Sequence, residues 1–286
     1  MNKEKPILVT GSHRSGSTWI GKILSLPSHV KYVSEPFNPT IGLKKIQTWF
    51  LYINQDNQEE YIKEIEKLLK FRGNVPFNLP AVKYWLTVGN KRPLLKDPIA
   101  CFSSDWLANN FNMEVVAILR HPAAFYASLK RVNWHFDFSN FLKQEKIMSD
   151  YLDKYRSLIE KENKSFVEEA GILWLCVYDV LDQFISKHPE WIIIRHEDVS
   201  LNPVEEFKKI YTQLDLDFTD KIKDKIIESS GGHNRVDAQT GKELDLNRDS
   251  QKLVKNWKKQ LTQDEIDQIK EITRSVSDKY YSDQDW

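Results

Sequence analysis

Short apolar runs recur along the chain, and each of them ends in a polar or glycine-containing turn. They lie within residues 7–9, 30–33, 92–97, 114–120 and 191–195. Uninterrupted apolar runs of this kind are typical of strands that are buried on both faces of a parallel sheet. Segments with apolar residues at helical spacing lie between the runs. This alternation predicts an α/β fold of three layers, with a central, mostly parallel five-stranded sheet flanked by helices.

The segments between the expected strands differ in how regular they are. Residues 41–71 have an interrupted helical spacing that predicts two helices, and we interpret residues 40–92 as a helical insertion. Residues 138–187 predict two further helices. The polar stretch 231–256 is long, glycine-containing and poorly periodic, so we expect it to be a lid. In the absence of repeats and low-complexity linkers, residues 1–286 are interpreted as a single domain.

Residues 6–20 combine a buried strand, a loop of small residues and the start of a helix, for which Ser17 is the expected N-cap. Backbone N–H groups gathered at such a helix start can hold a phosphate. Gly11 and Gly16 have the spacing of a Walker A loop, but Ser17 stands where the lysine of a nucleotidase would lie, and Arg14 lies inside the loop. The pattern predicts a P-loop-like cradle for a ligand other than a magnesium-bound nucleoside triphosphate. A tight strand-to-helix turn without a ligand is the alternative.

Composition argues against several classes of partner. The 41 Lys and Arg residues balance the 41 Asp and Glu residues, so there is no global basic field for nucleic acid or an anionic membrane. No apolar run has the length of a membrane span, which predicts a cytoplasmic protein without an integral membrane segment. Cys101 and Cys176 are expected to be buried free thiols. The histidines are not spaced as metal ligands, and no metal site is expected.

Four segments, in this order, resemble the sulfotransferases that use 3′-phosphoadenosine 5′-phosphosulfate (PAPS). They are residues 14–19, which read RSGSTW; residues 115–120 with Ser128 eight positions on; residues 192–198 with Pro203; and residues 253–257 with Leu261 and Thr262. The resemblance implies that the first segment is the 5′-phosphosulfate loop and that the second is the 3′-phosphate motif. It also implies that the last segment closes over the nucleotide.

The resemblance implies PAPS as the co-substrate, with no metal. The expected nucleotide-binding residues are Arg14, Ser15, Gly16, Ser17, Thr18, Trp19, Arg120 and Ser128, with Arg248 approaching from the lid. Physical chemistry agrees with this arrangement, because two anionic groups at opposite ends of a nucleotide need separate donors. Backbone amides and the fork of Arg14 suit the 5′ group, while Arg120 and Ser128 can converge on the 3′-phosphate.

Sulfuryl transfer to a hydroxyl needs a base for its proton and positive charge on the bridging oxygen. Sulfotransferases of small phenols and steroids place a His base after the strand that corresponds to residues 94–95, where this chain has Lys96 and Asp97. The pattern is closer to carbohydrate and protein-tyrosine sulfotransferases, in which a Glu base follows the loop. Glu35, 21 residues after Arg14, is therefore the expected base, and Lys96 is expected to neutralise the leaving group.

Local sequence adds a conformational expectation for Glu35 and leaves an alternative for its role. Pro36 disfavours a helical conformation at the preceding residue, so Glu35 is expected to be extended at the end of a strand. In the alternative, Glu35 is only the ion-pair partner of Arg14, and the base is Asp97 or His13.

The acceptor is expected to be a carbohydrate or glycolipid hydroxyl. Four tryptophans in or near the variable segments favour a sugar, namely Trp49, Trp85, Trp106 and Trp134. A peptide tyrosine and a small alcohol are the other acceptor classes. Two other functions compete with sulfuryl transfer. A P-loop kinase-like phosphotransferase is disfavoured by the missing loop lysine, and a non-catalytic nucleotide-binding protein by the joint presence of the expected site residues.

Overall fold

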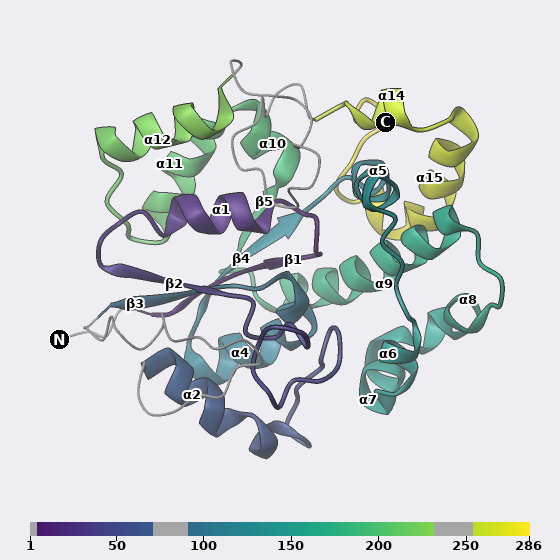
Figure 1. Cartoon of the computed structure of the whole chain (residues 1–286), viewed down its shortest axis with the longest axis horizontal. Coiled ribbons are helices and arrows are strands. Elements are labelled where there is room, and N and C mark those ends of the chain that lie inside the picture. The colour runs from purple at the N-terminus through teal and green to yellow at the C-terminus, as the bar shows by residue number, and fades with distance from the viewer. Residues whose placement is uncertain (1–4, 71–90, 232–253) are drawn as a thin grey trace.

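A computed structural model describes residues 5–70, 91–231 and 254–286 of the chain (Figure 1). Five parallel strands form one sheet in the order β2-β3-β1-β4-β5. The strands are β1 (Ile7–Gly11), β2 (Val30–Ser34), β3 (Arg92–Lys96), β4 (Glu114–Leu119) and β5 (Ile192–Arg195). The predicted fold class is confirmed, because helices flank this sheet and all of its strands are parallel.

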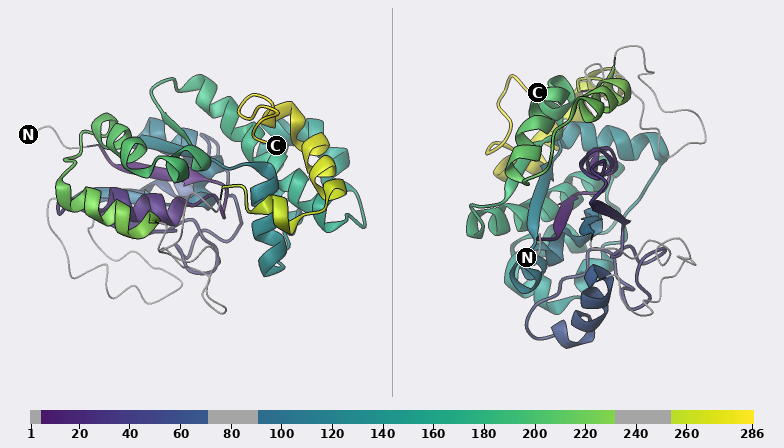
Figure 2. Two further views of the ribbon diagram at one scale, coloured as in Figure 1. Left: turned by 90° about the horizontal axis from the view of Figure 1, so that it is seen from above. Right: turned by 90° about the vertical axis from the view of Figure 1, so that its left-hand side faces the viewer.

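Side chains of the sheet alternate between two buried clusters, one on each face. Ile7 and Val9 share a cluster with apolar residues of α1, α11 and α12, whereas Leu8 belongs to the cluster that contains α4 and α9. These helices are α1 (Ser17–Leu24), α11 (Pro203–Gln213), α12 (Asp220–Ser230), α4 (Ser104–Phe111) and α9 (Phe166–Lys187). Figures 1 and 2 show the resulting layers, with the sheet between the two sets of helices.

Helices near the carboxyl edge of the sheet complete the fold. They are α5 (Pro122–Val132), α10 (His196–Leu201), α14 (Trp257–Gln260) and α15 (Gln263–Ser277). A capping box begins α15, since the side chains of Thr262 and Glu265 each bond the other residue's backbone N–H. Helix α15 packs along α9 at Gly171, where an added Cβ would lie 3.0 Å from Ile272 Cγ2.

The prediction of two helices within residues 41–71 is wrong for its first half. Residues 41–57 form turns and irregular chain, and only the 3₁₀ turn η1 (Gln58–Glu60) and α2 (Ile62–Lys70) are helical. Gly42 turns the chain sharply, and the next residue, Leu43, donates its N–H to the carbonyl of Pro36 at 2.8 Å. The apolar residues at helical spacing are nevertheless buried, so their periodicity reports burial and not helix.

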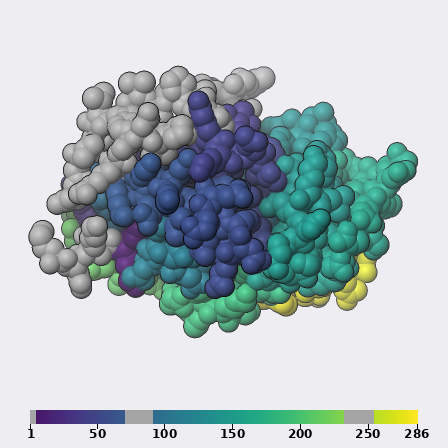
Figure 3. Space-filling view, turned by 90° about the horizontal axis from the view of Figure 1, so that it is seen from below, coloured from purple at the N-terminus to yellow at the C-terminus, as the bar shows by residue number. Residues whose placement is uncertain are grey.

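The prediction of two helices within residues 138–187 is also only partly right. Helix α9 is long, but the chain before it is divided into short turns, namely α6 (Ser139–Leu142), α7 (Glu145–Ile147), η3 (Met148–Leu152), η4 (Asp153–Tyr155) and α8 (Arg156–Glu160). This teal region lies beside the blue segment that contains α2 (Figure 3). The two are joined by hydrogen bonds from Trp49 N to Asn140 Oδ1 (3.2 Å) and from Tyr52 N to Gln144 Oε1 (2.8 Å).

Two smaller expectations concern the thiols and membrane spans. Cys101 and Cys176 are buried and free, as predicted. Within the described ranges, no helix combines the length and apolar character needed to cross a membrane. The 3₁₀ turn η2 (Pro98–Ser103), which contains Cys101, follows β3 directly and leads into α4.

The amino edge of the sheet is held by one buried arginine. Arg92 at the start of β3 is 5% exposed and forms an ion pair with Glu114 at the start of β4. Its other N–H groups donate to the carbonyls of Lys5 (2.7 Å) and Leu214 (2.6 Å). One side chain therefore ties two strands to the chain that precedes β1 and to the end of α11.

Replacing this arginine tests its stabilising role. Arg92→Met keeps the apolar stem but leaves two carbonyls and a carboxylate without their donor, and we expect the free energy of unfolding to fall by about 2–4 kcal/mol. Urea unfolding measures the loss. The neighbouring exposed Lys91 provides the control, because Lys91→Met removes a positive charge at the same edge. Equal stability of the two variants would contradict the assigned role.

Candidate active site

The loop after β1 is built for close approach of backbone and ligand. An added Cβ on Gly11 would lie 2.5 Å from the carbonyl oxygen of Ile118, and one on Gly16 would lie 2.2 Å from Cδ2 of His196. Gly16 has φ +87°, in the left-handed region that favours glycine. It is also the N-cap of α1, so the prediction that Ser17 takes this position is wrong by one residue.

Residues predicted for the two ends of the nucleotide meet at this loop. Arg14, which itself has φ +63°, donates from Nε to Oγ of Ser128 on α5 at 3.0 Å. Ser15 and Ser17 are buried, and Thr18 is half-buried. The hydroxyl of Ser15 has no hydrogen-bond partner among the described residues. The loop thus offers a buried donor without a protein acceptor.

Trp19 turns away from the loop toward the helical layer above it. Its Nε1 donates to Oγ of Ser229 at 3.0 Å, and its ring meets Phe207 edge-on at 5.2 Å between centroids. The indole therefore joins α1 to α11 and α12. Its expected role beside the nucleotide stays a prediction.

A buried ion pair lies at the ends of β2 and β3. Lys96 is 2% exposed, its stem packs against Gly21 of α1, and its ammonium group pairs with the carboxylate of Glu35. The second oxygen of Glu35 accepts a hydrogen bond from Asn38 Nδ2 at 2.8 Å. The structure therefore brings together two of the three predicted catalytic residues. The observed partner of Glu35 is Lys96, and not Arg14 as in the alternative.

The backbone of Glu35 differs from the expectation. Its φ is +49°, so the residue is left-handed and not extended. Pro36 does exclude the right-handed helical region, as expected. The chain must also turn back at this point, because Phe37 N donates to the carboxylate of Asp97 at 2.5 Å. The left-handed residue supplies that turn.

Asp97 has a structural role, because its carboxylate is held by backbone N–H groups. It caps η2, and its carboxylate accepts hydrogen bonds from the backbone N–H groups of Phe37, Ile99 (2.9 Å) and Ala100 (3.2 Å). Burial raises the pKa of Asp97 to about 7, although the hydrogen bond from Phe37 opposes this. Three backbone donors fix both oxygens in place, so this carboxylate is poorly placed to receive a proton from a substrate.

His13, in the loop after β1, lies among aromatic rings. Its ring centroid is 4.3 Å from that of Trp134, 5.2 Å from Phe125 and 5.9 Å from Phe50. Within the described residues, neither ring nitrogen has a hydrogen-bond partner. Burial, with a smaller contribution from Arg14, lowers the pKa of His13 to about 3. The side chain is therefore neutral near pH 7.

Arg120 follows β4 and is held by residues that sequence analysis did not assign. Its Nη1 donates to Nδ1 of His196, and its Nε lies 3.6 Å from Oε1 of Glu197. Burial, followed by the charge of Arg120, holds the pKa of His196 well below its ordinary value, so the imidazole is a neutral acceptor. The same imidazole packs on Gly16, so it connects Arg120 to the loop after β1.

The signal for these two residues was present but incomplete. His196 and Glu197 follow a buried strand directly, as the other site residues do. The neighbour of that strand, β4, became known only from the observed strand order.

The expected lid lies mostly outside the described residues, and so does Arg248. Lys255 is described, and its Nζ lies 3.5 Å from the carbonyl oxygen of Gln284. The described ranges contain no group of three or more His, Cys, Asp or Glu side chains that could hold a metal ion.

Known proteins resemble this chain in sequence pattern and in fold. The profile of the sulfotransferase family matches residues 6–220. The sulfotransferase domain from the curacin biosynthetic pathway is 16% identical and has a TM-score of 0.53, over 96% of this chain and 98% of that one. Mouse sulfotransferase SULT7A1 complexed with PAP is 14% identical and has a TM-score of 0.50, over 99% and 88%. No curated protein sequence matches the chain significantly.

The neutral state of His13 has a consequence for acid stability. Its pKa in the folded protein lies below its ordinary value of 6.5, so the unfolded chain binds the proton more tightly. The stabilisation is present above pH 6.5 and is lost as the pH falls from 6.5 toward 3. We expect His13→Phe to reduce the pH dependence of the free energy of unfolding by up to about 1.4 kcal/mol per pH unit within this window. Urea unfolding between pH 4 and 7 tests this, and parallel pH profiles for parent and variant would contradict it.

Proposed function

The chain belongs to the sulfotransferase family, and we propose that it transfers a sulfuryl group from PAPS to the hydroxyl of a carbohydrate or glycolipid, with Glu35 as the base and without a metal. One observation supports this mechanism above all others. The cations Arg14, Lys96 and Arg120 gather with Glu35 around one glycine-containing loop at the carboxyl edge of the sheet.

The described residues fit a nucleotide with two anionic ends. The loop provides the unpartnered Ser15 hydroxyl and the N-terminus of α1, both suited to the 5′-phosphosulfate. Arg120 provides the cation for the 3′-phosphate. Its guanidinium group is held by His196, which is neutral. The PAP in the mouse neighbour's crystal supports the same choice of nucleotide.

Charge balance assigns complementary roles to the ion pair. When the acceptor oxygen forms its bond to sulfur, the bond from sulfur to the bridging phosphate oxygen breaks, and the leaving nucleotide gains negative charge. Lys96 and Arg14 stabilise that charge, while Glu35 accepts the hydroxyl proton. Asn38 and Lys96 hold the two oxygens of Glu35 and so fix its orientation before the acceptor arrives.

Two of the four candidate tryptophans support a sugar acceptor. Trp134 and Trp49 are half-buried and meet edge-on at 6.2 Å, and Trp134 also covers His13 beside the loop. Indole faces suit the apolar face of a pyranose. Trp106 is 4% exposed and donates to Gln58, so it belongs to the core, and Trp85 lies outside the described residues.

The first test removes the proposed proton acceptor. Glu35→Gln keeps the shape of the side chain but cannot take the proton. We expect kcat to fall by about 10²–10⁴-fold, with nearly unchanged affinity for adenosine 3′,5′-bisphosphate (PAP), the product nucleotide. Loss of the charge also leaves Lys96 without its carboxylate, so thermal unfolding must confirm that the variant is folded at the assay temperature. The exposed Glu59 supplies the control Glu59→Gln. Turnover of Glu35→Gln at the parental rate would overturn the base assignment.

The second test addresses the acceptor. The enzyme is incubated with PAPS that carries a labelled sulfuryl group, in the presence of EDTA. Transfer of the label is measured to pools of sugars, glycolipids, tyrosine peptides and small alcohols. We expect transfer to sugars or glycolipids, and Trp134→Ala should raise the acceptor KM about tenfold while the KM for PAPS stays constant. Trp106→Phe is the control, because Trp106 packs in the core. Transfer only to peptides or alcohols would exclude the proposed acceptor class, and loss of transfer in EDTA would exclude the metal-free mechanism.

A further inference from the structure

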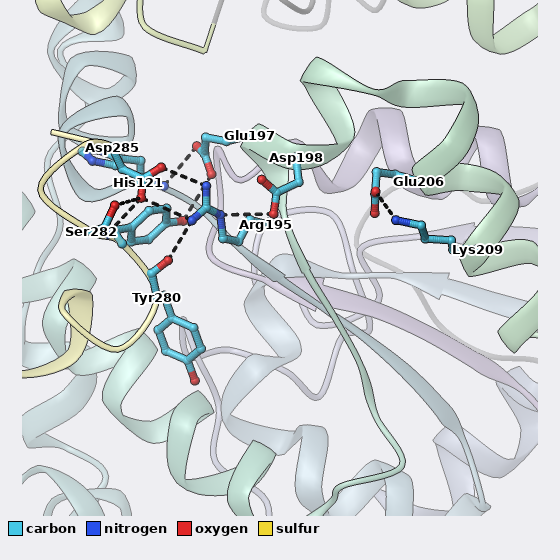
Figure 4. A network of polar contacts seen from close by, with 10 residues as sticks. His121, Arg195, Glu197, Asp198, Glu206, Lys209, Tyr280, Ser282 and Asp285 are labelled. Carbon is cyan, nitrogen blue, oxygen red and sulfur yellow. Dashed lines mark hydrogen bonds and ion pairs between the residues drawn. The ribbon is translucent and has the colours of Figure 1, made fainter.

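Residues 280–286 lie against the start of α10, next to the residues that hold Arg120 (Figure 4). Arg195, at the end of β5, makes several of the polar contacts between this segment and α10. Its Nη1 donates to the carbonyl of Tyr280 at 2.9 Å, and its Nη2 lies 3.0 Å from Oδ1 of Asp285. Its Nε is 3.2 Å from Asp198 on α10. The guanidinium group therefore joins α10 to this segment, through an ion pair with Asp198 and charge-assisted hydrogen bonds to Tyr280 and Asp285.

A second contact runs through a buried tyrosine. Tyr281 is 3% exposed, and its hydroxyl donates to Oε2 of Glu197 at 3.2 Å. The ring of Trp286 lies 4.4 Å from that of His121, which also stacks on Trp257 at 4.9 Å. Tyr281 thus contacts the carboxylate of Glu197 directly, and Trp286 packs on His121, whose backbone N–H also bonds that carboxylate.

The other side of Glu197 faces Arg120. Its Oε1 accepts a hydrogen bond from the backbone N–H of His121 at 3.1 Å and lies 3.6 Å from Nε of Arg120. Glu197 is 4% exposed, and a buried carboxylate keeps its place only while its donors remain. A single carboxylate therefore connects Tyr281 to Arg120.

We infer that residues 280–286 position Arg120 through Glu197 and in this way set the affinity for the 3′-phosphate. This inference rests on the proposed function, in which Arg120 binds that phosphate. Tyr281 and Asp285 are positioning residues, because they act through Glu197 and Arg195. A guanidinium group held in advance by His196 and Glu197 loses less freedom when it binds an anion.

The segment lies outside the region that the family profile matches. The match to the family profile ends at residue 220, so residues 280–286 lie beyond it. The contacts of this segment nevertheless reach the strand ends that the profile includes, at Arg195 and Glu197. A segment outside the matched region is thereby connected to the proposed nucleotide site.

The experiment compares two nucleotides that differ only in the 3′ group. Isothermal titration calorimetry measures binding of adenosine 3′,5′-bisphosphate and of adenosine 5′-phosphate to the full chain, to Tyr281→Phe and to Asp285→Asn. We expect both variants to lose about five- to tenfold in affinity for the bisphosphate and to keep parental affinity for the monophosphate. Asp283→Asn is the matched control, since Asp283 lies in the same segment, is 93% exposed and pairs only with Lys270 in the described structure.

Arg120→Ala separates the inference from the function on which it rests. If the parent chain binds both nucleotides equally well, the assignment of Arg120 to the 3′-phosphate fails. If the parent prefers the bisphosphate and Arg120→Ala abolishes that preference, the assignment stands. Parental preference in both Tyr281→Phe and Asp285→Asn would then overturn the positioning role. An equal loss of affinity for both nucleotides would overturn it too, because it would indicate general loosening of the site.

Discussion

Charged side chains are buried at the carboxyl edge of the parallel sheet. Each of them therefore needs an ion-pair or hydrogen-bond partner. Lys96 is stabilised by Glu35, Arg120 by His196 and Glu197, and Asp97 by backbone N–H groups. An unpaired charge at this depth would cost several kcal/mol. The requirement explains why the segments after the strands are turns with fixed conformations. Lys96 pairs with one carboxylate, whereas Arg120 and Asp97 each have more than one partner.

The pairing also divides the edge into two regions with different chemistry. On one side of the loop after β1, Lys96 and Glu35 form an ion pair. On the other side, Arg120 is held by the neutral imidazole of His196 and by the carboxylate of Glu197. The loop and the helix α1 that follows it lie between the two regions and contact both, since Gly16 packs on His196 and Gly21 of α1 packs on Lys96.

Much of the fold could be predicted from the sequence, since all five strands contain a short apolar stretch that ends in a turn, and their parallel arrangement follows from the helices between them. The pairing of Glu35 with Lys96 did not follow, because it rests on β2 and β3 being neighbours in the observed strand order. The role of His196 did not follow, since it depends on the strand order, which no local pattern encodes. Residues 41–57 were misjudged for another reason, because an irregular chain can bury apolar residues at helical spacing when a turn such as that at Gly42 redirects it.

The packing of His196 on Gly16 restricts how this sequence can vary. A side chain at position 16 needs the space that the imidazole fills, at 2.2 Å from the added Cβ. A smaller apolar residue at position 196 would release that space but would remove the acceptor that holds Arg120. A side chain at position 16 therefore requires a smaller residue at position 196, and Arg120 requires that this residue keep an acceptor. In a set of related sequences, the two positions are therefore expected to change together or to remain constant together.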